Sequence, residues 1–258
     1  MVTWYTVFNC VTIGFPRALT VEVTNYEGRG IRSAGLIVAF ALTLGALTGC
    51  IGGRPTEYLA LAVAAGGFGA LGFLDDRYGD RTVSGFRGHL TAALRGRFTT
   101  GFVKMAGGAL IALLCAVILG TPWWFLLNDA VIIALLANAL NLLDTRPARA
   151  SCVAGLLCIP ALPLSLFALA AALGWFPIDR QRKMMLGDAG SNALGATCGV
   201  LFLVTYQNDY VHMMALAVLM AFHVWTELFS INAFIARRPI LDRVDRWIHG
   251  TPPSDTGV

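Results

Sequence analysis

The chain has 258 residues, of which 57% are hydrophobic and only 13% charged, and its mean hydropathy is +0.68. Soluble domains carry roughly 25% charged residues, so this composition excludes an ordinary soluble enzyme and favours a polytopic helical membrane protein. The formal net charge is +4, but the distribution of charge along the chain is more informative than the total. The six cysteines lie in apolar runs without close-spaced pairs, which indicates neither a zinc site nor a disulfide framework.

Apolar segments separated by polar loops predict an all-α membrane helical bundle with about eight membrane segments. Residues 2–16 are either a short crossing or an interfacial anchor. We expect longer crossings at 34–53, 58–74, 101–120, 122–143, 189–206 and 210–236. The polar loop that follows Asp75 and Asp76 predicts an amphipathic helix around 87–96, and residues 240–249 predict a second one on the anionic cytoplasmic leaflet.

The basic residues predict the orientation of the bundle, because Lys and Arg in short loops mark the cytoplasmic side. We expect a single integral membrane domain, 1–258, whose cytoplasmic parts are the loops 17–33, 75–100, 144–150 and 179–190 and the tail 237–258. All 19 Lys and Arg residues except Arg54 then fall on the cytoplasmic side.

Segment 151–178 must leave the cytoplasmic face and return to it in this arrangement, because both of its flanking loops are cytoplasmic. Its length of about 28 residues is too short for two full crossings of ~20 residues each. We therefore predict a shortened pair of helices or a re-entrant hairpin that turns at Pro160–Pro163.

Asn138, Asn141 and Asp144 lie on the last turns of the helix expected at 122–143. Their i, i+3, i+6 spacing predicts that all three side chains share one side of the helix. An Asp at the centre of a bilayer costs ~2.5–3.5 kcal/mol, so this group belongs at the membrane edge, facing protein, ligand or water. Arg146 and Arg149 follow directly and favour a phosphorylated ligand. The alternative is a helix end capped by its own polar side chains.

Three further carboxylates are expected at the same membrane face. Asp75 and Asp76 end the helix at 58–74, and Asp188 stands in Gly187-Asp188-Ala-Gly190-Ser191, which opens the helix at 189–206. Adjacent carboxylates repel each other unless a cation neutralises them, and hard oxygen ligands suit Mg²⁺. The pattern predicts a metal-assisted phosphoryl-transfer site. The alternatives are neutralisation by nearby arginines and a simple N-cap role for Asp188.

These motifs resemble those of the polyprenyl-phosphate N-acetylhexosamine-1-phosphate transferases, glycosyltransferase family 4. The superfamily includes phospho-N-acetylmuramoyl-pentapeptide transferases and UDP-GlcNAc:undecaprenyl-phosphate GlcNAc-1-phosphate transferases. The resemblance covers roughly residues 25–206 and is carried by three segments in order: Gly72-Phe-Leu-Asp75-Asp76, Asn138-Ala-Leu-Asn141-Leu-Leu-Asp144 and Gly187-Asp188-Ala-Gly190-Ser191.

The resemblance implies a reaction at the cytoplasmic face of a bacterial inner membrane. The phosphate of a polyprenyl lipid attacks the β-phosphorus of a UDP-amino sugar, which gives lipid-diphospho-sugar and UMP in cell-wall or surface glycan synthesis. The cofactor would be Mg²⁺, with Mn²⁺ as the alternative ion. A homodimer fits the resemblance, and a nucleic-acid partner is not expected.

The resemblance also implies roles for individual residues. Asp75, Asp76 and Asp188 would be catalytic, with Asp188 as the principal metal ligand and Asp76 as the second. The substrate-binding residues would be Asn138, Asn141, Asp144, Arg146, Arg149, Lys104, His89 and Ser191. Lys104 and His89 each have a plainer alternative, a snorkelling interfacial lysine and a surface histidine respectively.

The chain departs from the superfamily in ways that keep other functions open. Asp144 is followed by Thr145-Arg146-Pro147 where the superfamily usually continues as Gly-Leu-Asp-Gly, and the chain is short. It also lacks the histidine-rich loop with which the muropeptide enzymes read their substrate, so a muropeptide substrate is not expected. The alternatives are a catalytically lapsed scaffold, an ion-coupled transporter and, as the chemical runner-up, a CDP-alcohol phosphotransferase.

Overall fold

The computed structural model describes residues 22–23, 30–79, 85–96, 99–182 and 184–250. This part of the chain is helical apart from two short strands, β1 (Glu22–Val23) and β2 (Gly30–Ile31), which pair antiparallel. A 3₁₀ turn, η2 (Arg32–Gly35), leads from β2 into the bundle. The predicted class, an all-α polytopic membrane protein, is confirmed.

The long helices follow the predicted apolar segments. They are α2 (Leu36–Gly49), α3 (Pro55–Tyr78), α5 (Thr100–Ile118), α6 (Leu126–Leu143), α9 (Gly187–Thr205) and α10 (Asp209–Leu228), with a 3₁₀ turn, η3 (Cys50–Gly52), after α2. Within the described residues, α3, α5, α6 and α10 are long and apolar enough to cross a membrane. Helix α4 (Gly85–Leu94) lies where the first amphipathic helix was expected, whereas the segment 2–16 lies outside the described residues.

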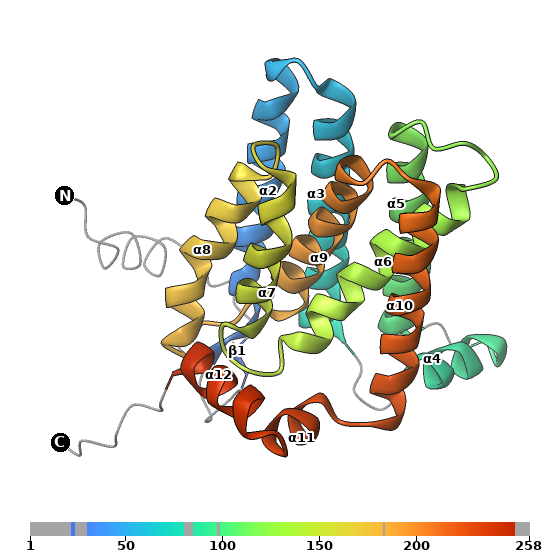
Figure 1. Ribbon diagram of the computed structural model, residues 1–258. Coiled ribbons are helices and arrows are strands. Elements are labelled where there is room, and N and C mark those ends of the chain that lie inside the picture. Colours follow the sequence, from blue (N-terminus) through green and yellow to red (C-terminus); the bar gives the residue numbers. More distant parts are fainter. Residues whose placement is uncertain (1–21, 24–29, 80–84, 97–98, 183, 251–258) are drawn as a thin grey trace, which may run out of the picture.

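Segment 151–178 forms the shortened helix pair that the charge pattern predicts. Helix α7 (Arg149–Cys158) continues into the 3₁₀ turn η4 (Ile159–Ala161), and α8 (Leu166–Arg180) returns beside it (Figure 1). In the turn, the Ser165 hydroxyl donates to the Cys158 carbonyl oxygen at 2.5 Å. The two helices have 10 and 15 residues, fewer than the ~20 of a full crossing, so Asp144 and Asp188 lie at the same end of the bundle.

The predicted crossing at 210–236 is wrong beyond residue 228. Phe229 and Ser230 adopt extended backbone angles, and Ser230 Oγ accepts a hydrogen bond from the Ala233 amide at 3.4 Å. Serine is a favoured N-cap, so it begins a new helix in spite of the apolar run around it. The short α11 (Ile231–Ala236) and the predicted amphipathic α12 (Pro239–His249) then run across the end of the bundle (Figure 1).

Helix α9 lies in the middle of the bundle and contacts α2, α3, α6 and α7 (Figure 1). Nearly all of its side chains are buried, and many of them are Gly, Ala or Ser. A Cβ at Gly195 would lie 2.4 Å from the Leu136 carbonyl oxygen of α6, and one at Gly72 of α3 would lie 2.2 Å from the Asp188 carbonyl oxygen. Because small residues let helix backbones approach closely in membrane bundles, these glycines fix α9 against its neighbours.

A buried polar cluster ties the helices together at the opposite end of the bundle. His212 Nδ1 lies 2.9 Å from Asp129 Oδ1, and His212 Nε2 lies 2.6 Å from the Tyr206 carbonyl oxygen. The Thr121 hydroxyl donates to Asp129 Oδ2 at 3.0 Å. Since buried polar groups cost free energy unless they are paired, these contacts hold α10 against α6 and the end of α9.

Candidate active site

The end of α3 is held against the start of α9 by Asp76. Its Oδ1 accepts from the Asp188 amide at 3.2 Å, and its Oδ2 accepts from the Ala189 amide at 3.0 Å. The first amides of a helix have no partner within the helix, and the helix dipole favours negative charge there. Glycine at position 72 allows α3 to come this close to α9. Asp76 therefore positions the backbone that carries Asp188.

Lys104, in the first turns of α5, joins the other two predicted catalytic carboxylates. Its ammonium makes a direct ion pair with Asp188 and lies 3.5 Å from Asp75 Oδ2. All three side chains are largely buried, with exposed fractions of 12 to 23%. Two carboxylates that would repel each other thus share one cation, and three separate helices meet at that point.

Asn141 of α6 and Ser191 of α9 complete this cluster. In the amide orientation that satisfies its neighbours, Asn141 Nδ2 donates to Asp188 Oδ1 and to Ser191 Oγ, each at 3.1 Å. Asn141 Oδ1 then accepts from Lys104 Nζ at 3.3 Å. The Ser191 hydroxyl donates to the Gly187 carbonyl oxygen at 2.6 Å. The second and third sequence motifs are therefore in direct contact.

Asp144 lies at the end of α6, buried beside the start of α9. Its burial raises the pKa of this carboxyl well above its usual range, and the charges of Asp179, Asp188 and Asp76 raise it further. A hydrogen bond with the Gly187 backbone acts in the opposite direction. Asp144 Oδ1 has no hydrogen-bond partner within the described part of the chain. A buried acceptor without a donor is costly, so Asp144 is a strained part of this site.

Asp179, near the end of α8, is a buried residue that the sequence pattern did not single out. It is fully buried, and its Oδ2 accepts from the Ala148 amide at 2.8 Å. Its Oδ1, like that of Asp144, has no hydrogen-bond partner among the described residues. The signal that could have identified Asp179 is a single Asp directly after the apolar run that ends in Pro177-Ile178. The basic residues that follow Asp179 indicated the start of an exposed loop instead.

Four of the predicted substrate-binding residues are not part of this cluster. Asn138 is exposed, and the predicted common face of Asn138, Asn141 and Asp144 is wrong for this residue. An α-helix has 3.6 residues per turn, so each step of three residues rotates the side chain by about 60°. Asn138 is two such steps from Asp144 and therefore points about 120° away from it. Arg146 is exposed as well. Arg149 is buried and pairs with Asp245 of α12. The side chain of His89 lies outside the described residues, although its backbone is in α4.

The metal ligands expected from the sequence, Asp188 and Asp76, stay a prediction, and the two carboxylates have different surroundings in the structure. No group of three or more His, Cys, Asp or Glu side chains converges as a metal cage within the described ranges. Mg²⁺ usually takes only one or two protein carboxylates and completes its shell with water and phosphate. Asp188 and Asp75 already share a cation, the Lys104 ammonium, whereas both oxygens of Asp76 accept backbone amides. The pair of carboxylates that holds a cation here is therefore Asp188 and Asp75.

A small cleft adjoins this cluster. Its volume is about 230 Å³, and it lies between α3 and α5, lined by Leu71, Leu74, Asp75, Tyr78, Thr99, Thr100, Val103 and Lys104. A larger hollow of about 530 Å³ lies at the opposite end, around Asp129 and His212, and contains none of the predicted site residues. The smaller cleft is the one that combines an apolar lining with the carboxylate and ammonium of the site.

Fold and site together define a polytopic helical membrane protein with a carboxylate–lysine cluster at one end of its bundle. No protein-family model matches the chain. The sequence is 30% identical to the phospho-N-acetylmuramoyl-pentapeptide-transferase of Desulforudis audaxviator, in an alignment that covers 68% of this chain and 59% of that protein. The chain thus spans about three fifths of the length of this relative. The similarity is distant, and it supports the superfamily that the three motifs indicate.

Proposed function

We propose that the chain transfers a sugar-1-phosphate from a UDP-amino sugar to a polyprenyl phosphate at the cytoplasmic face of a bacterial membrane and releases UMP. The observation that carries this proposal is the meeting of Asp75, Lys104 and Asp188 from three helices at one end of the bundle. Asn141 and Ser191 adjoin them. A relative whose name describes a phosphosugar transferase is consistent with this chemistry.

The cleft between α3 and α5 supports a lipid phosphate as the acceptor. Leu71, Leu74 and Val103 give it an apolar wall, and Lys104 and Asp75 lie at its polar end. An isoprenoid chain would lie along the apolar wall with its phosphate at the Lys104 ammonium, which binds phosphate as a point charge. Asp75 would orient that phosphate or take its proton. In this arrangement the nucleophilic oxygen would lie beside Asp188.

The donor nucleotide would lie on the other side of Asp188, toward Asn141, Ser191 and Asp144. Asn141 offers an amide that can exchange its present partners for phosphate oxygens. A bound Mg²⁺ at Asp188 and Asp75 would neutralise charge on the diphosphate. An oxygen of the lipid phosphate forms a bond to the β-phosphorus. The bond between that phosphorus and the oxygen it shares with the α-phosphorus breaks, and UMP leaves with the electron pair of that bond.

The test is UMP release by the purified protein incubated with polyprenyl phosphate and a panel of UDP-sugars, with and without Mg²⁺. We expect Mg²⁺-dependent release from at least one UDP-amino sugar. Asp188→Asn should reduce the rate at least about 10³-fold, since it removes a charge that acts in the transition state. Asp209→Asn serves as a matched control, because Asp209 is an exposed carboxylate at the opposite end of the bundle.

Two outcomes would contradict the proposal. Full activity of Asp188→Asn would remove the central carboxylate from the mechanism. A folded protein that releases no UMP from any nucleotide sugar in the panel would instead favour a scaffold or an ion-coupled transporter.

A further inference from the structure

The chain after α10 does not leave the bundle but crosses its end on the side of the site. Figure 1 shows α11 and α12 running across the long helices rather than along them. Pro239 at the first turn of α12 sets its starting direction, because proline fits that position and cannot continue a preceding helix. Helix α12 contacts α11 and α7. After the last membrane-crossing helix, α10, the chain therefore continues into a helix that lies across the end of the bundle that carries the site.

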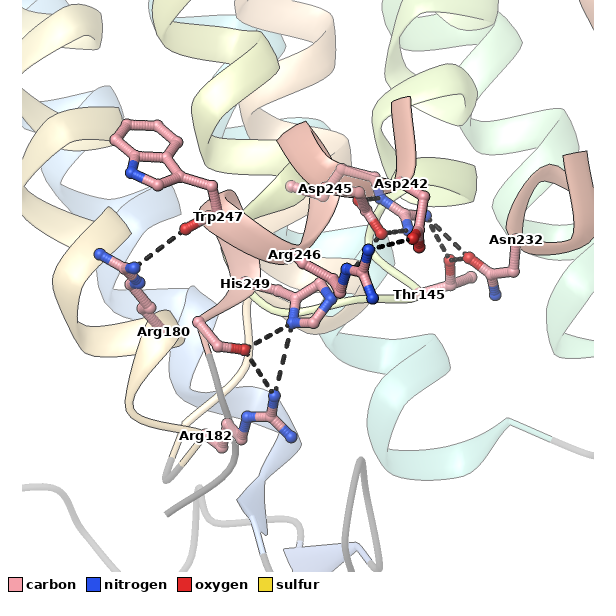
Figure 2. Close-up of polar contacts among 11 residues, drawn as sticks. Thr145, Arg180, Arg182, Asn232, Asp242, Asp245, Arg246, Trp247 and His249 are labelled. Carbon is pink, nitrogen blue, oxygen red and sulfur yellow. Dashed lines mark hydrogen bonds and ion pairs between the residues drawn. The ribbon is translucent and has the colours of Figure 1, made fainter. Parts of the chain in front are cut away.

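One face of α12 is attached to the loop that follows Asp144. The Arg149 guanidinium donates to both oxygens of Asp245, from Nε at 2.8 Å and from Nη2 at 2.9 Å. Its Nη1 donates to Asn232 of α11 at 2.9 Å and to Thr145 at 3.2 Å. Figure 2 labels Thr145, Asn232 and Asp245, the three partners of this guanidinium. Arg149 is only 4% exposed, so the pair is well shielded from water.

The last turn of α12 is attached to the segment that leads to Asp188. Arg180 Nη2 donates to the Trp247 carbonyl oxygen at 2.9 Å, and Arg182 Nη2 donates to the Gly250 carbonyl oxygen at 3.2 Å. Cations are favoured at the C-terminal end of a helix, where carbonyl groups lack partners within the helix. Helix α12 thus makes hydrogen bonds to two segments beside the site: the one that follows Asp144 and the one that precedes Asp188.

The opposite face of α12 carries apolar side chains that no part of the described chain covers. Ile240, Val244 and Trp247 follow one another at i, i+4 and i+7 and are 78%, 50% and 68% exposed. In Figure 2 the Trp247 indole points away from Asp242 and Asp245. Four arginines within α12 or directly before it are exposed, although Arg246 is paired with Asp242: Arg237, Arg238, Arg243 and Arg246. An apolar strip flanked by basic side chains matches the charge and hydrophobicity of an anionic lipid surface.

We propose that α12 is an interfacial helix that binds the anionic leaflet with its apolar strip and, through its other face, holds the loops 145–149 and 180–182 in place. The position of α12 in the lipid surface then determines the positions of these two loops, which flank the site. This proposal concerns membrane contact and loop order, and it does not depend on the reaction proposed above.

The first experiment measures lipid contact at Trp247. The protein is reconstituted in vesicles of phosphatidylcholine and phosphatidylglycerol, with and without bromine on the acyl chains, and its tryptophan fluorescence is compared with that of Trp247→Phe. The difference between the two proteins isolates Trp247. We expect bromine to quench this difference signal, and more strongly as the anionic lipid fraction rises. Trp175→Phe, which removes a buried tryptophan of α8, is the control and should give an unquenched difference. A Trp247 signal that bromine does not change would overturn the proposal.

The second experiment uses amide hydrogen exchange to measure how far α12 stabilises the loop 145–149. Asp245→Asn removes the charge that pairs with Arg149, and we expect exchange in 145–149 to rise about tenfold or more. Asp242→Asn is the matched control, since Asp242 is one turn away on the same helix and, within the described residues, its carboxylate pairs with the exposed Arg246 at 2.6 Å. Equal exchange in all three proteins, or an equal rise in both variants, would overturn the proposal.

A variant that unfolds would show faster exchange in α9 as well, and this distinguishes local release from global loss of structure. Arg149→Lys then replaces Asp245→Asn, because lysine keeps the charge but loses the two-pronged contact. Release of 145–149 with an unchanged α9 is the supporting result. An unchanged 145–149 segment in Arg149→Lys contradicts the coupling.

Discussion

Single residues decide the electrostatics of the site, and Lys104 is the most informative of them. Its ammonium stands between Asp75 and Asp188, where the sequence motifs alone predict a metal ion. Two carboxylates at ~4 Å repel each other by roughly 4 kcal/mol at an effective dielectric constant of 20, so some cation is needed there. The structure therefore predicts competition between the lysine ammonium and a divalent ion at the same place.

Lys104→Met tests this competition. Without Mg²⁺ the variant should lose about 3 kcal/mol of stability, because the two partly buried carboxylates lose the ammonium that neutralises them. Added Mg²⁺ should raise its melting temperature more than that of the wild type, since an ion that binds only the folded state stabilises it by mass action. Thermal unfolding in detergent, with and without Mg²⁺, measures both effects.

Lys104→Arg is the matched control and should behave like the wild type toward Mg²⁺, because it keeps the positive charge. Equal Mg²⁺ shifts in Lys104→Met and the wild type would show that no divalent ion takes the place of the ammonium.

At the scale of elements, the site exists because the backbone of α9 lies against those of α3 and α6. The sequence of α9 is rich in small residues, and Gly72 of α3 removes the side chain that would separate the two helices. Only at this separation can Asp76 reach the amides of Asp188 and Ala189. The glycine in the first motif is therefore a packing residue that sets the geometry of the third motif.

Gly72→Ala should shift the two helices apart. The added Cβ would lie 2.2 Å from the Asp188 carbonyl oxygen, a backbone atom that cannot rotate away. We expect a loss of about 3 kcal/mol, at the upper end for overpacked cores, together with a fall in UMP release if the proposed reaction is correct. Chemical or thermal unfolding gives the stability, and hydrogen exchange at Asp188 and Ala189 reports on the cap.

Gly66→Ala lies in the same helix and provides the comparison. Its Cβ would meet only the Thr43 side chain, at 3.3 Å or more, so this variant should be neutral or more stable by up to about 1 kcal/mol. If the two variants were equally stable, close contact at Gly72 would not be what holds α3 against α9.

At the scale of the whole molecule, the alternation of the helices places every site carboxylate at one end and the Asp129–His212 cluster at the other. The shortened α7–α8 pair is what preserves this alternation, because one full crossing in its place would put Asp188 at the far end. Among the described residues, Lys104, Arg149, Arg180 and Arg182 lie at the site end, whereas Arg54 precedes α3 at the opposite end. The positive-inside rule then predicts a site that faces the cytoplasm.

Reporter fusions in a bacterial membrane test this orientation. Alkaline phosphatase, which folds only outside the cytoplasm, should be active when fused after Gly53 and inactive when fused after Arg146 or Gly250. Green fluorescent protein at the same positions should give the reverse pattern. Active phosphatase after Arg146 would place the site on the outer side and remove the cytoplasmic nucleotide sugar from the proposal.

The sequence by itself determined the class of protein, the positions of nearly all helices, the helix pair at 151–178 and the meeting of three polar motifs. These features follow from local hydrophobicity, helix length and the distribution of charge, which act along the chain. The break at Ser230 was missed because an N-cap serine inside an apolar run is a weaker signal than the run itself.

Only the tertiary structure decided which polar groups pair. The exposure of Asn138, the amide partners of Asp76, the fork of Arg149 on Asp245 and the burial of Asp179 all depend on helix rotation and on contacts between residues far apart in sequence. A carboxylate looks the same in the sequence whether it caps a helix, meets a lysine or lies unpaired. Its neighbours in space decide which, because Coulomb and hydrogen-bond energies depend on distances of a few ångströms that the local pattern does not contain.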